Sequence, residues 1–300
     1  MGIVDSHVHL YSPDVNGDPA GWAAAHGESR WSAMATRRRR DGRPVQSFPS
    51  VDGLLASMDA AGIGRAVLQG WYWEHPATCA VQNRFLAECV ETHPDRLSAF
   101  ASIHPAAGWE GVLAAVRRAR DEGFSGIGEL LPAAQGCTAG SPVIRELASA
   151  AGDLRMPMTF HATDPEARPY PGRIETPQEE FLGLARDFPA TVFILAHWGG
   201  LLPLRNKGTA LPGNLYFDTA ASPLLYDRGI WRRFVGAVGP DRVLFGSDFP
   251  LNAYPALDAE PSFGRLVAEA RESGLEASDL DALFHGNARR LLDPGAGGRE

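Results

Sequence analysis

Two histidines stand two residues apart in the stretch DSHVHL near the start of the chain, at His7 and His9. The surrounding run Ile3–Leu10 predicts a β-strand, on which side chains two positions apart point to the same side. Two imidazoles that project together can begin a divalent-metal site, which a third histidine and a carboxylate would complete. A single pair of this kind is a weak signal, so its meaning depends on the ends of the other strands.

Further side chains that could bind a metal stand at the ends of other short apolar runs. They are Glu129 in GIGEL, His161 in FHA, His197 in LAHWGG and Asp248 in LFGSDFP. In a parallel barrel the carboxyl ends of the strands share one rim, where side chains from distant positions converge. The sequence therefore predicts that six metal-competent side chains meet on one face.

The runs that carry these side chains belong to a repeat of short apolar runs and amphipathic segments. Apolar residues of the connecting segments recur with helical spacing, as in 51–58, and glycines follow as stop signals. Such alternation predicts parallel strands joined by crossover helices, and eight units predict an α/β fold, the (β/α)8 TIM barrel. The candidate strands are Ile3–Leu10, Arg65–Trp71, Leu97–Ile103, Gly126–Leu131, Met158–His161, Val192–His197, Leu215–Thr219 and Val243–Ser247.

One long insertion departs from this repeat. We expect residues 1–294 to form a single barrel domain, with the insertion at about 11–50 and a flexible tail at 295–300. The insertion is far longer than the roughly 2–6 residues of an ordinary βα loop, and after the first strand it could cap the catalytic face. Its basic run Arg37–Arg40 could clamp an anionic substrate or form a solvated loop tip.

Composition restricts the class of protein. A chain of 300 residues, 44% of them hydrophobic, can bury a sizeable core, and no run approaches the about 18 apolar residues of a membrane span. The formal net charge of -8 argues against nucleic acid as the main partner. The start lacks the pattern of a signal peptide, and three cysteines without CxxC spacing suit a reducing cytoplasm. We expect a cytoplasmic protein that acts on a small molecule and binds neither nucleic acid nor membranes.

Several stretches resemble the amidohydrolase superfamily, and most closely its amidohydrolase-2 branch, which includes the aminocarboxymuconate-semialdehyde decarboxylase type. They are DSHVHL, FHA, LAHWGG, LYFDTA, LFGSDFP and HGNARRLL, in the family's order over essentially the whole chain. The resemblance implies a divalent metal, zinc in the first place and manganese as the alternative. Its ligands would be His7, His9, His161 and Asp248. Homodimers are common in this family, so a homodimer is also allowed.

The resemblance further implies catalytic roles for His197 and Asp248. The imidazole of His197 would polarise a substrate oxygen or orient a nucleophilic water, and Asp248 would move a proton. The number of ions stays open. Glu129 could bridge two ions, with His161 and His197 ligating the second, or it could hydrogen-bond to a ligating histidine in a one-ion site. We favour one ion because of the overall resemblance.

Four further side chains are candidates for substrate binding. Trp71 and Trp73 follow the second strand and could wall a pocket for a flat substrate, although packing beneath a loop is an equal alternative. Trp198, next to His197, carries the same two interpretations. His104 ends the third strand and could contact substrate or enter a turn.

The expected reaction is hydrolysis of a C–O or C–N bond in a lactone, ester or amide by a metal-activated water. The first alternative is non-oxidative decarboxylation of an unsaturated or aromatic acid on the same metal site. An arginine placed to hold a carboxylate would favour decarboxylation, and Arg168 and Arg173 are candidates. A metal-free lactonase is the second alternative. A barrel that binds without catalysis is disfavoured because all the expected ligands are present.

Overall fold

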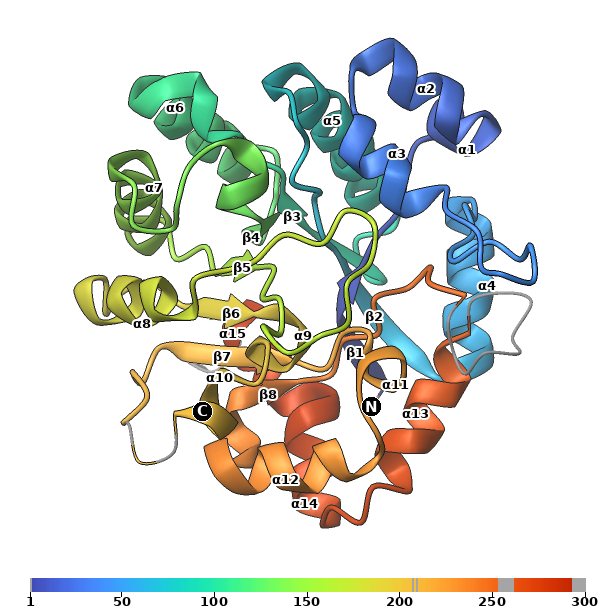
Figure 1. Cartoon of the computed structure of the whole chain (residues 1–300), viewed down its shortest axis with the longest axis vertical. Coiled ribbons are helices and arrows are strands. Elements are labelled where there is room, and N and C mark those ends of the chain that lie inside the picture. The colour runs from blue at the N-terminus through green and yellow to red at the C-terminus, as the bar shows by residue number, and fades with distance from the viewer. Residues whose placement is uncertain (1, 207, 209, 253–261, 293–300) are drawn as a thin grey trace.

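The computed structural model describes residues 2–206, 208, 210–252 and 262–292 of the chain. Within these residues, eight parallel strands form one sheet in the order of the chain, and every strand overlaps a predicted run. Helices surround the strands, as expected for a TIM barrel (Figure 1). The strands are β1 Ile3–Val8, β2 Ile63–Leu68, β3 Leu97–Ala101, β4 Gly126–Leu130, β5 Met158–Phe160, β6 Phe193–Leu195, β7 Leu215–Asp218 and β8 Val243–Leu244.

Hydrogen bonds between β1 and the segment after β8 close the barrel. The backbone N–H of His9 donates to the carbonyl of Phe249 over 2.7 Å, and that of Asp248 donates to the carbonyl of His7 over 2.9 Å. A parallel bridge pairs Val8 with Phe249. Because these bonds lie at the carboxyl end of β1, they fix two predicted ligands of β1 beside Asp248.

The long helices of the outer layer pack apolar faces onto the strands. In α4 the side chains of Leu54 and Met58 are fully buried, Ser50 caps the first turn, and Gly62 ends the helix with φ of 73°. The outer helices are α4 Val51–Ala61, α5 Pro76–Thr92, α6 Gly108–Asp121, α7 Pro142–Asp153, α8 Gln178–Asp187, α12 Gly229–Val238, α13 Phe263–Arg271, α14 Ala277–Asp281 and α15 Asn287–Leu292.

Shorter helical segments lie in the connections. A π-helical turn, Ala282–Gly286, joins α14 to α15. The others are α9 Ala196–Gly199, α10 Leu202–Arg205 and α11 Ser222–Leu225, with 3-10 turns at Pro105–Ala107, Pro132–Gln135 and Pro240–Arg242.

The insertion after β1 contains three short helices that the sequence patterns did not predict. They are α1 Pro13–Gly17, α2 Pro19–His26 and α3 Ser29–Ala35, two of which begin with proline. The insertion shares a small core with the loop after β2, in which the rings of Trp31 and Trp73 lie 5.5 Å apart and are almost fully buried. This core attaches the insertion to the loop after β2.

Among the described residues, none of the helices has the length and apolar character needed to cross a membrane. The tail predicted at 295–300 lies outside the described residues.

Candidate functional site

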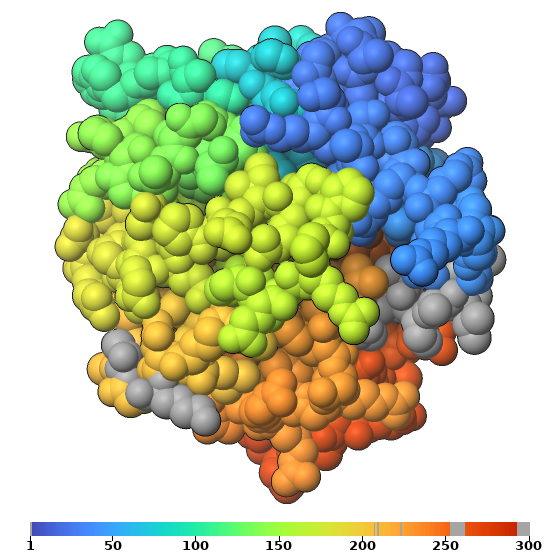
Figure 2. All heavy atoms as spheres, in the orientation of Figure 1, coloured from blue at the N-terminus to red at the C-terminus, as the bar shows by residue number. Residues whose placement is uncertain are grey.

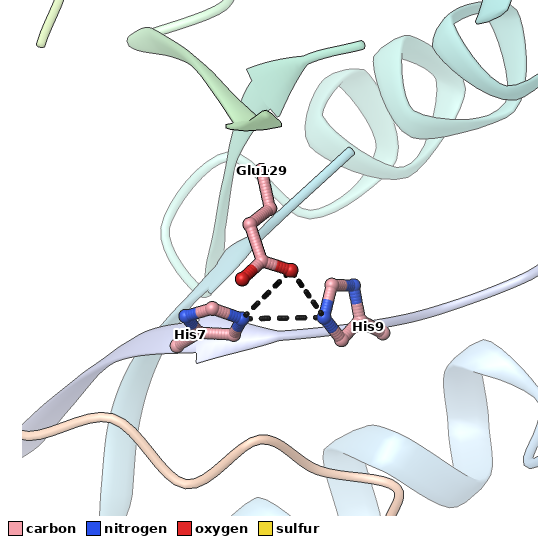
Figure 3. Close-up of side chains that lie close together, drawn as sticks. All are labelled: His7, His9 and Glu129. Carbon is pink, nitrogen blue, oxygen red and sulfur yellow. Dashed lines mark hydrogen bonds and ion pairs between the residues drawn. The ribbon is translucent and has the colours of Figure 1, made fainter. Parts of the chain in front are cut away.

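The predicted histidines of β1 meet a carboxylate from β4. The Nε2 atoms of His7 and His9 lie 3.2 Å apart. Each also lies near Oε2 of Glu129, at 3.8 Å from His7 and 3.7 Å from His9 (Figure 3). All three side chains are buried, and their nitrogen and oxygen atoms converge on one point between β1 and β4.

The other carboxylate oxygen of Glu129 faces two more predicted histidines. Its Oε1 lies 3.0 Å from Nδ1 of His161 and 3.5 Å from Nε2 of His197. The two histidine nitrogens are 3.1 Å apart. Glu129 therefore belongs to two groups of metal-competent atoms, one on each oxygen.

Asp248 stands between these two groups. Its Oδ1 lies 3.5 Å from Nε2 of His9 and 3.9 Å from Nε2 of His7. Its Oδ2 lies 4.0 Å from Nδ1 of His197. The structure thus brings all six predicted side chains together at the carboxyl ends of the strands.

Asp218, at the end of β7, holds two of these histidines in place. It is almost fully buried, and its Oδ2 lies 2.9 Å from Nδ1 of His7. Its Oδ1 accepts hydrogen bonds from the backbone N–H groups of His197 and Ala220, each over 3.0 Å. Because Nδ1 of His7 is engaged by a carboxylate, Nε2 is the nitrogen that faces the cluster, as in many metal-binding histidines.

The backbone at this rim is left-handed at residues other than glycine. His197 and Trp198 each have φ of 57°, and Asp248 has φ of 64°. Residues with a side chain rarely adopt this region, and where they do, the surrounding structure holds them, often at active sites. Both residues that were predicted to be catalytic are thus among the six described non-glycine residues with positive φ.

The electrostatics of the cluster favour a cation. Burial alone would lower the pKa of His7, but the carboxylates of Asp218 and Glu129 outweigh it and raise the pKa to about 10. Burial would raise the pKa of Glu129, yet the neighbouring His161 and His7 hold it well below its usual value. Burial and the charge of His7 lower the pKa of His9 to about 4. The carboxylates thus draw positive charge into a buried site.

These donors fit a divalent metal. Imidazole nitrogens and carboxylate oxygens suit zinc and other first-row ions. Two nitrogens that bind one tetrahedral ion at about 2.0–2.1 Å lie about 3.3 Å apart, close to the spacing of 3.2 Å between His7 and His9. The bond from His7 to Asp218 supplies the orienting carboxylate that such ligands usually have.

A cavity of about 610 Å³ opens above the cluster. Three parts of the chain contribute to its walls. They are the insertion, the loop after β5, and the helix α11 together with the residues that follow it. In Figure 2 the yellow-green loop after β5 lies at the centre of this face, next to the blue insertion. The volume is within the range of about 300–1,000 Å³ that is common for small-molecule sites. The insertion, which was predicted to cap this face, contributes Met34, Arg37, Val45 and Gln46.

Of the predicted substrate contacts, Trp71 is the one among the described residues that lines this cavity. Its ring stacks on Tyr72 at 4.3 Å and meets the ring of His9 edge-on at 5.1 Å. Trp73 lies in the core of the insertion, where its Nε1 donates to Oε1 of Gln82 over 2.5 Å. Packing accounts for its position.

Trp198 and His104 also lie away from the lining. Trp198 is fully buried against Trp231, and its Nε1 donates to the hydroxyl of Ser222 over 3.0 Å. His104 begins a 3-10 turn, and its Nδ1 accepts from the N–H of Ala106 over 3.0 Å. Packing and turn formation explain these two side chains.

The arginines singled out in the sequence separate into two groups. Arg168 lines the cavity, whereas Arg173 donates to the carbonyls of Asp164 and Pro165 outside the described lining. Within the basic run Arg37–Arg40, Arg37 alone is among the described residues that line the cavity.

Sequence reasoning missed several lining residues. Gln46, Tyr170 and Tyr226 come from the insertion and from the loops after β5 and β7. The signal that could have found them is their position after the strands, because such loops form the walls of barrel sites. Which loop side chains turn inward cannot be read from strand periodicity.

Comparisons with known proteins place the chain among the amidohydrolases. A family model described as Amidohydrolase (Amidohydro_2) matches residues 4–293. A comparison with curated proteins gives no match. Among solved structures, 2,6-dihydroxybenzoate decarboxylase from Rhizobium is 19% identical, with a TM-score of 0.67 over 98% of this chain and 99% of that one.

Two other similar structures contain manganese. The 5-carboxyvanillate decarboxylase from Novosphingobium aromaticivorans, complexed with manganese and 4-hydroxy-3-methoxy-5-nitrobenzoic acid, is 16% identical. It has a TM-score of 0.72 over 97% of this chain and 96% of that one. The dihydroxybenzoic acid decarboxylase from a Polaromonas species, with manganese and 2-nitroresorcinol, is 20% identical, with a TM-score of 0.67 over 97% of each chain. At these identities the likeness shows that the fold is shared.

Proposed function

Because the chain belongs to the amidohydrolase family of enzymes, we propose that it catalyses metal-dependent, non-oxidative decarboxylation of an aromatic carboxylic acid. The observation that carries this proposal is the lining of the cavity, in which Arg37 and Arg168 face the space above the histidine and carboxylate cluster. Guanidinium groups recognise carboxylates by charge-assisted hydrogen bonds. This reverses the order expected from the sequence, where hydrolysis came first.

The walls suit a flat ring. Trp71 and Tyr72 stack on each other and line the cavity beside His161, whose ring lies 5.6 Å from that of Tyr72. Aromatic side chains of this kind pack against planar substrates. The three similar structures are named as decarboxylases of hydroxybenzoic acids, which supports the same substrate class.

We assign His7, His9, His161 and Asp248 as the ligands of a divalent metal. Manganese is the preferred ion because two of the similar structures contain it, and zinc is the alternative. When bound, such an ion would supply Lewis-acid polarisation of substrate oxygens.

The remaining chemistry belongs to side chains of the cluster. Burial would lower the pKa of His197, but its hydrogen bond to Glu129 and the charge of Asp248 raise it, so the imidazole can donate to a substrate oxygen. Asp248 lines the cavity and would give a proton to the ring carbon that bears the carboxylate. The C–C bond then breaks, its electrons return to the ring, and carbon dioxide leaves.

One observation favours hydrolysis as a second candidate. The two oxygens of Glu129 face different histidine groups, His7 with His9 and His161 with His197. A carboxylate in this position could bridge two ions, and paired ions are common in hydrolytic enzymes. The number of ions therefore separates the two candidates.

The proposal is tested by turnover before and after removal of metal. Protein treated with a chelator, then reloaded with manganese or zinc, is supplied with hydroxybenzoic acids and separately with lactones, esters and amides. We expect carbon dioxide release from an aromatic acid, lost on chelation and restored by metal. Acid release from a lactone, ester or amide, without carbon dioxide release, would support hydrolysis instead. Turnover that survives complete metal removal would point to the metal-free lactonase.

A further inference from the structure

Two neighbouring leucines are exposed where α11 borders the cavity. Leu224 is 42% exposed and Leu225 is 37% exposed, and among the described residues Trp109 is the other large hydrophobic side chain that is exposed. Trp109 lies outside the described lining of the cavity, whereas both leucines belong to it. Exposed apolar side chains that adjoin one another beside a cavity indicate a surface that a bound molecule covers.

The apolar surface continues onto the neighbouring connections of the barrel. Just before α11, the N–H of Ala221 donates to the carbonyl of Ser247, in the segment after β8, over 3.3 Å. This segment leads to Leu251, which lines the cavity together with Val45 of the insertion. The N–H of Asn252 donates to the carbonyl of Val45 over 2.7 Å, so the two segments lie side by side. We call Val45, Leu251 and the two leucines of α11 the apolar wall.

The charged part of the lining outside the cluster gathers at the loop after β5. Asp164 and Arg168 of this loop line the cavity, and Oδ1 of Asp164 accepts from Nη1 of Arg205 over 2.8 Å. Arg37 of the insertion also lies against this loop, with its guanidinium carbon 5.5 Å from the ring centroid of Tyr170. The apolar wall, which follows β7, β8 and β1, is thus chemically distinct from the wall that follows β5.

The cavity is larger than one aromatic ring needs. Its volume of about 610 Å³ has room for roughly twenty groups of the size of a water molecule, about twice the number of non-hydrogen atoms in benzoate. In the proposed reaction the carboxylate that is lost lies at His197 and Asp248, where the proton is delivered. A single ring held there leaves part of the cavity for a substituent.

We propose that the apolar wall binds an alkyl side chain of the substrate, which is therefore an alkyl-substituted aromatic acid. This rests on the proposed function and specifies its substrate class. The leucine and valine side chains offer no hydrogen-bond partner, so a polar substituent would lose its contacts with water there without replacement. A hydrocarbon chain instead gains free energy by leaving water, and it covers Leu224 and Leu225 at the same time.

Binding of simple acids to the manganese-loaded protein tests the apolar wall without turnover. Isothermal titration calorimetry compares benzoate with meta- and para-alkylbenzoates whose chains lengthen from methyl to butyl. In at least one of the two series we expect the affinity to rise about two- to fourfold for each added methylene group. In the double variant Leu224→Ser with Leu225→Ser, the ratio of butylbenzoate to benzoate affinity should fall about tenfold or more.

Trp109→Ser is the control, because it makes the same kind of change at an exposed hydrophobic side chain outside the described lining. It should keep the gain with chain length. The proposal is overturned if neither series gains affinity with chain length, or if the double variant keeps the full gain. In the second case, a change from dimer to monomer on sedimentation would show that the leucines contact a second copy of the chain. A lost gain in the double variant, together with no carbon dioxide release from any acid, would retain the apolar wall and reject the decarboxylase.

Discussion

At the residue scale, the geometry of the histidine and carboxylate cluster depends on Asp218, which is not among the described residues that line the cavity. Asp218 engages Nδ1 of His7 at 2.9 Å and accepts from the backbone N–H of His197 at 3.0 Å. It therefore sets which nitrogen of His7 faces the metal site and where the backbone places His197. Such orienting carboxylates typically change metal affinity when they are replaced.

We expect Asp218→Asn to lower the affinity for manganese or zinc about 10- to 100-fold, because the amide no longer carries the charge that orients His7. Competition with a metal-binding dye measures the affinity. Asp14→Asn makes the same chemical change at an exposed position of α1 and should leave the affinity unchanged. Equal affinities in wild type and Asp218→Asn would show that the hydrogen bond to His7 does not support the site.

Asp248→Asn should reduce turnover by roughly 10²–10⁴-fold, because an amide cannot deliver the proton. Its Oδ1 can still approach Nε2 of His9, from which the carboxylate lies 3.5 Å away, so metal binding should fall only in part. Initial rates and the metal content of the same preparation give the two readouts. A variant with metal bound and a near-normal rate would remove Asp248 from the proton transfer.

The sequence could predict the six cluster residues because each stands at the end of a strand, where barrel topology dictates convergence. Asp218 follows the same rule, and its hydrogen bonds to His7 and His197 needed the structure. Gln46 could not be singled out as a lining residue, because no strand periodicity governs the insertion. For the tryptophans the sequence left substrate contact and packing as equal alternatives, and only the structure separates them, with Trp71 at the cavity and Trp73 packed against the insertion.

At the element scale, the eight strands were predictable because buried parallel strands are short apolar runs between turn residues. The helices of the insertion were not, because α1 and α3 are only 5 and 7 residues long and carry too few turns to show a period. The observed β8 has two residues, Val243–Leu244, where five were predicted. After Leu244 the chain leaves the ladder and bends to present Asp248 with φ of 64°.

At the same scale, a buried carboxyl group between two outer helices makes the stability of the protein depend on pH. Glu269 on α13 is 7% exposed, and its Oε1 accepts from Nε1 of Trp231 on α12 over 2.9 Å. Burial raises its pKa above the usual 4.5, so the folded state binds the proton more tightly than the unfolded state. The protonated Glu269 therefore contributes to the free energy of unfolding. Its contribution is complete below about pH 4.5 and is lost as the pH rises through the pKa of the folded state.

Glu269→Gln keeps an acceptor for Trp231 and does not titrate. The unfolding free energy of this variant relative to wild type should therefore increase as the pH rises from 4 toward neutrality. Denaturant unfolding across this range measures the difference. Glu146→Gln on the exposed face of α7 should show no such trend. A difference for Glu269→Gln that does not change with pH would mean that burial leaves this carboxyl unperturbed.

At the scale of the whole molecule, the histidine and carboxylate cluster lies at one rim of the barrel. Separate parts of the chain form the walls of the cavity above it. The insertion after β1 supplies Arg37 and Gln46, and the loop after β5 supplies Arg168 and Tyr170. The fold is shared with decarboxylases that are at most 20% identical to this chain, so the walls can differ where the strands do not. Substrate choice is therefore expected to lie in the insertion, the loop after β5 and α11.

Metal content per chain tests the central claim, a single divalent ion in the cluster, most directly. Plasma mass spectrometry on protein purified without chelator or affinity metal should find about one ion per chain. Glu129→Gln should retain about one, as should Glu146→Gln, the same change on an exposed helix. Two ions per chain, falling to one or none in Glu129→Gln, would make Glu129 a bridging ligand and favour hydrolysis. No ion in protein that still turns over substrate would contradict the metal-dependent account altogether.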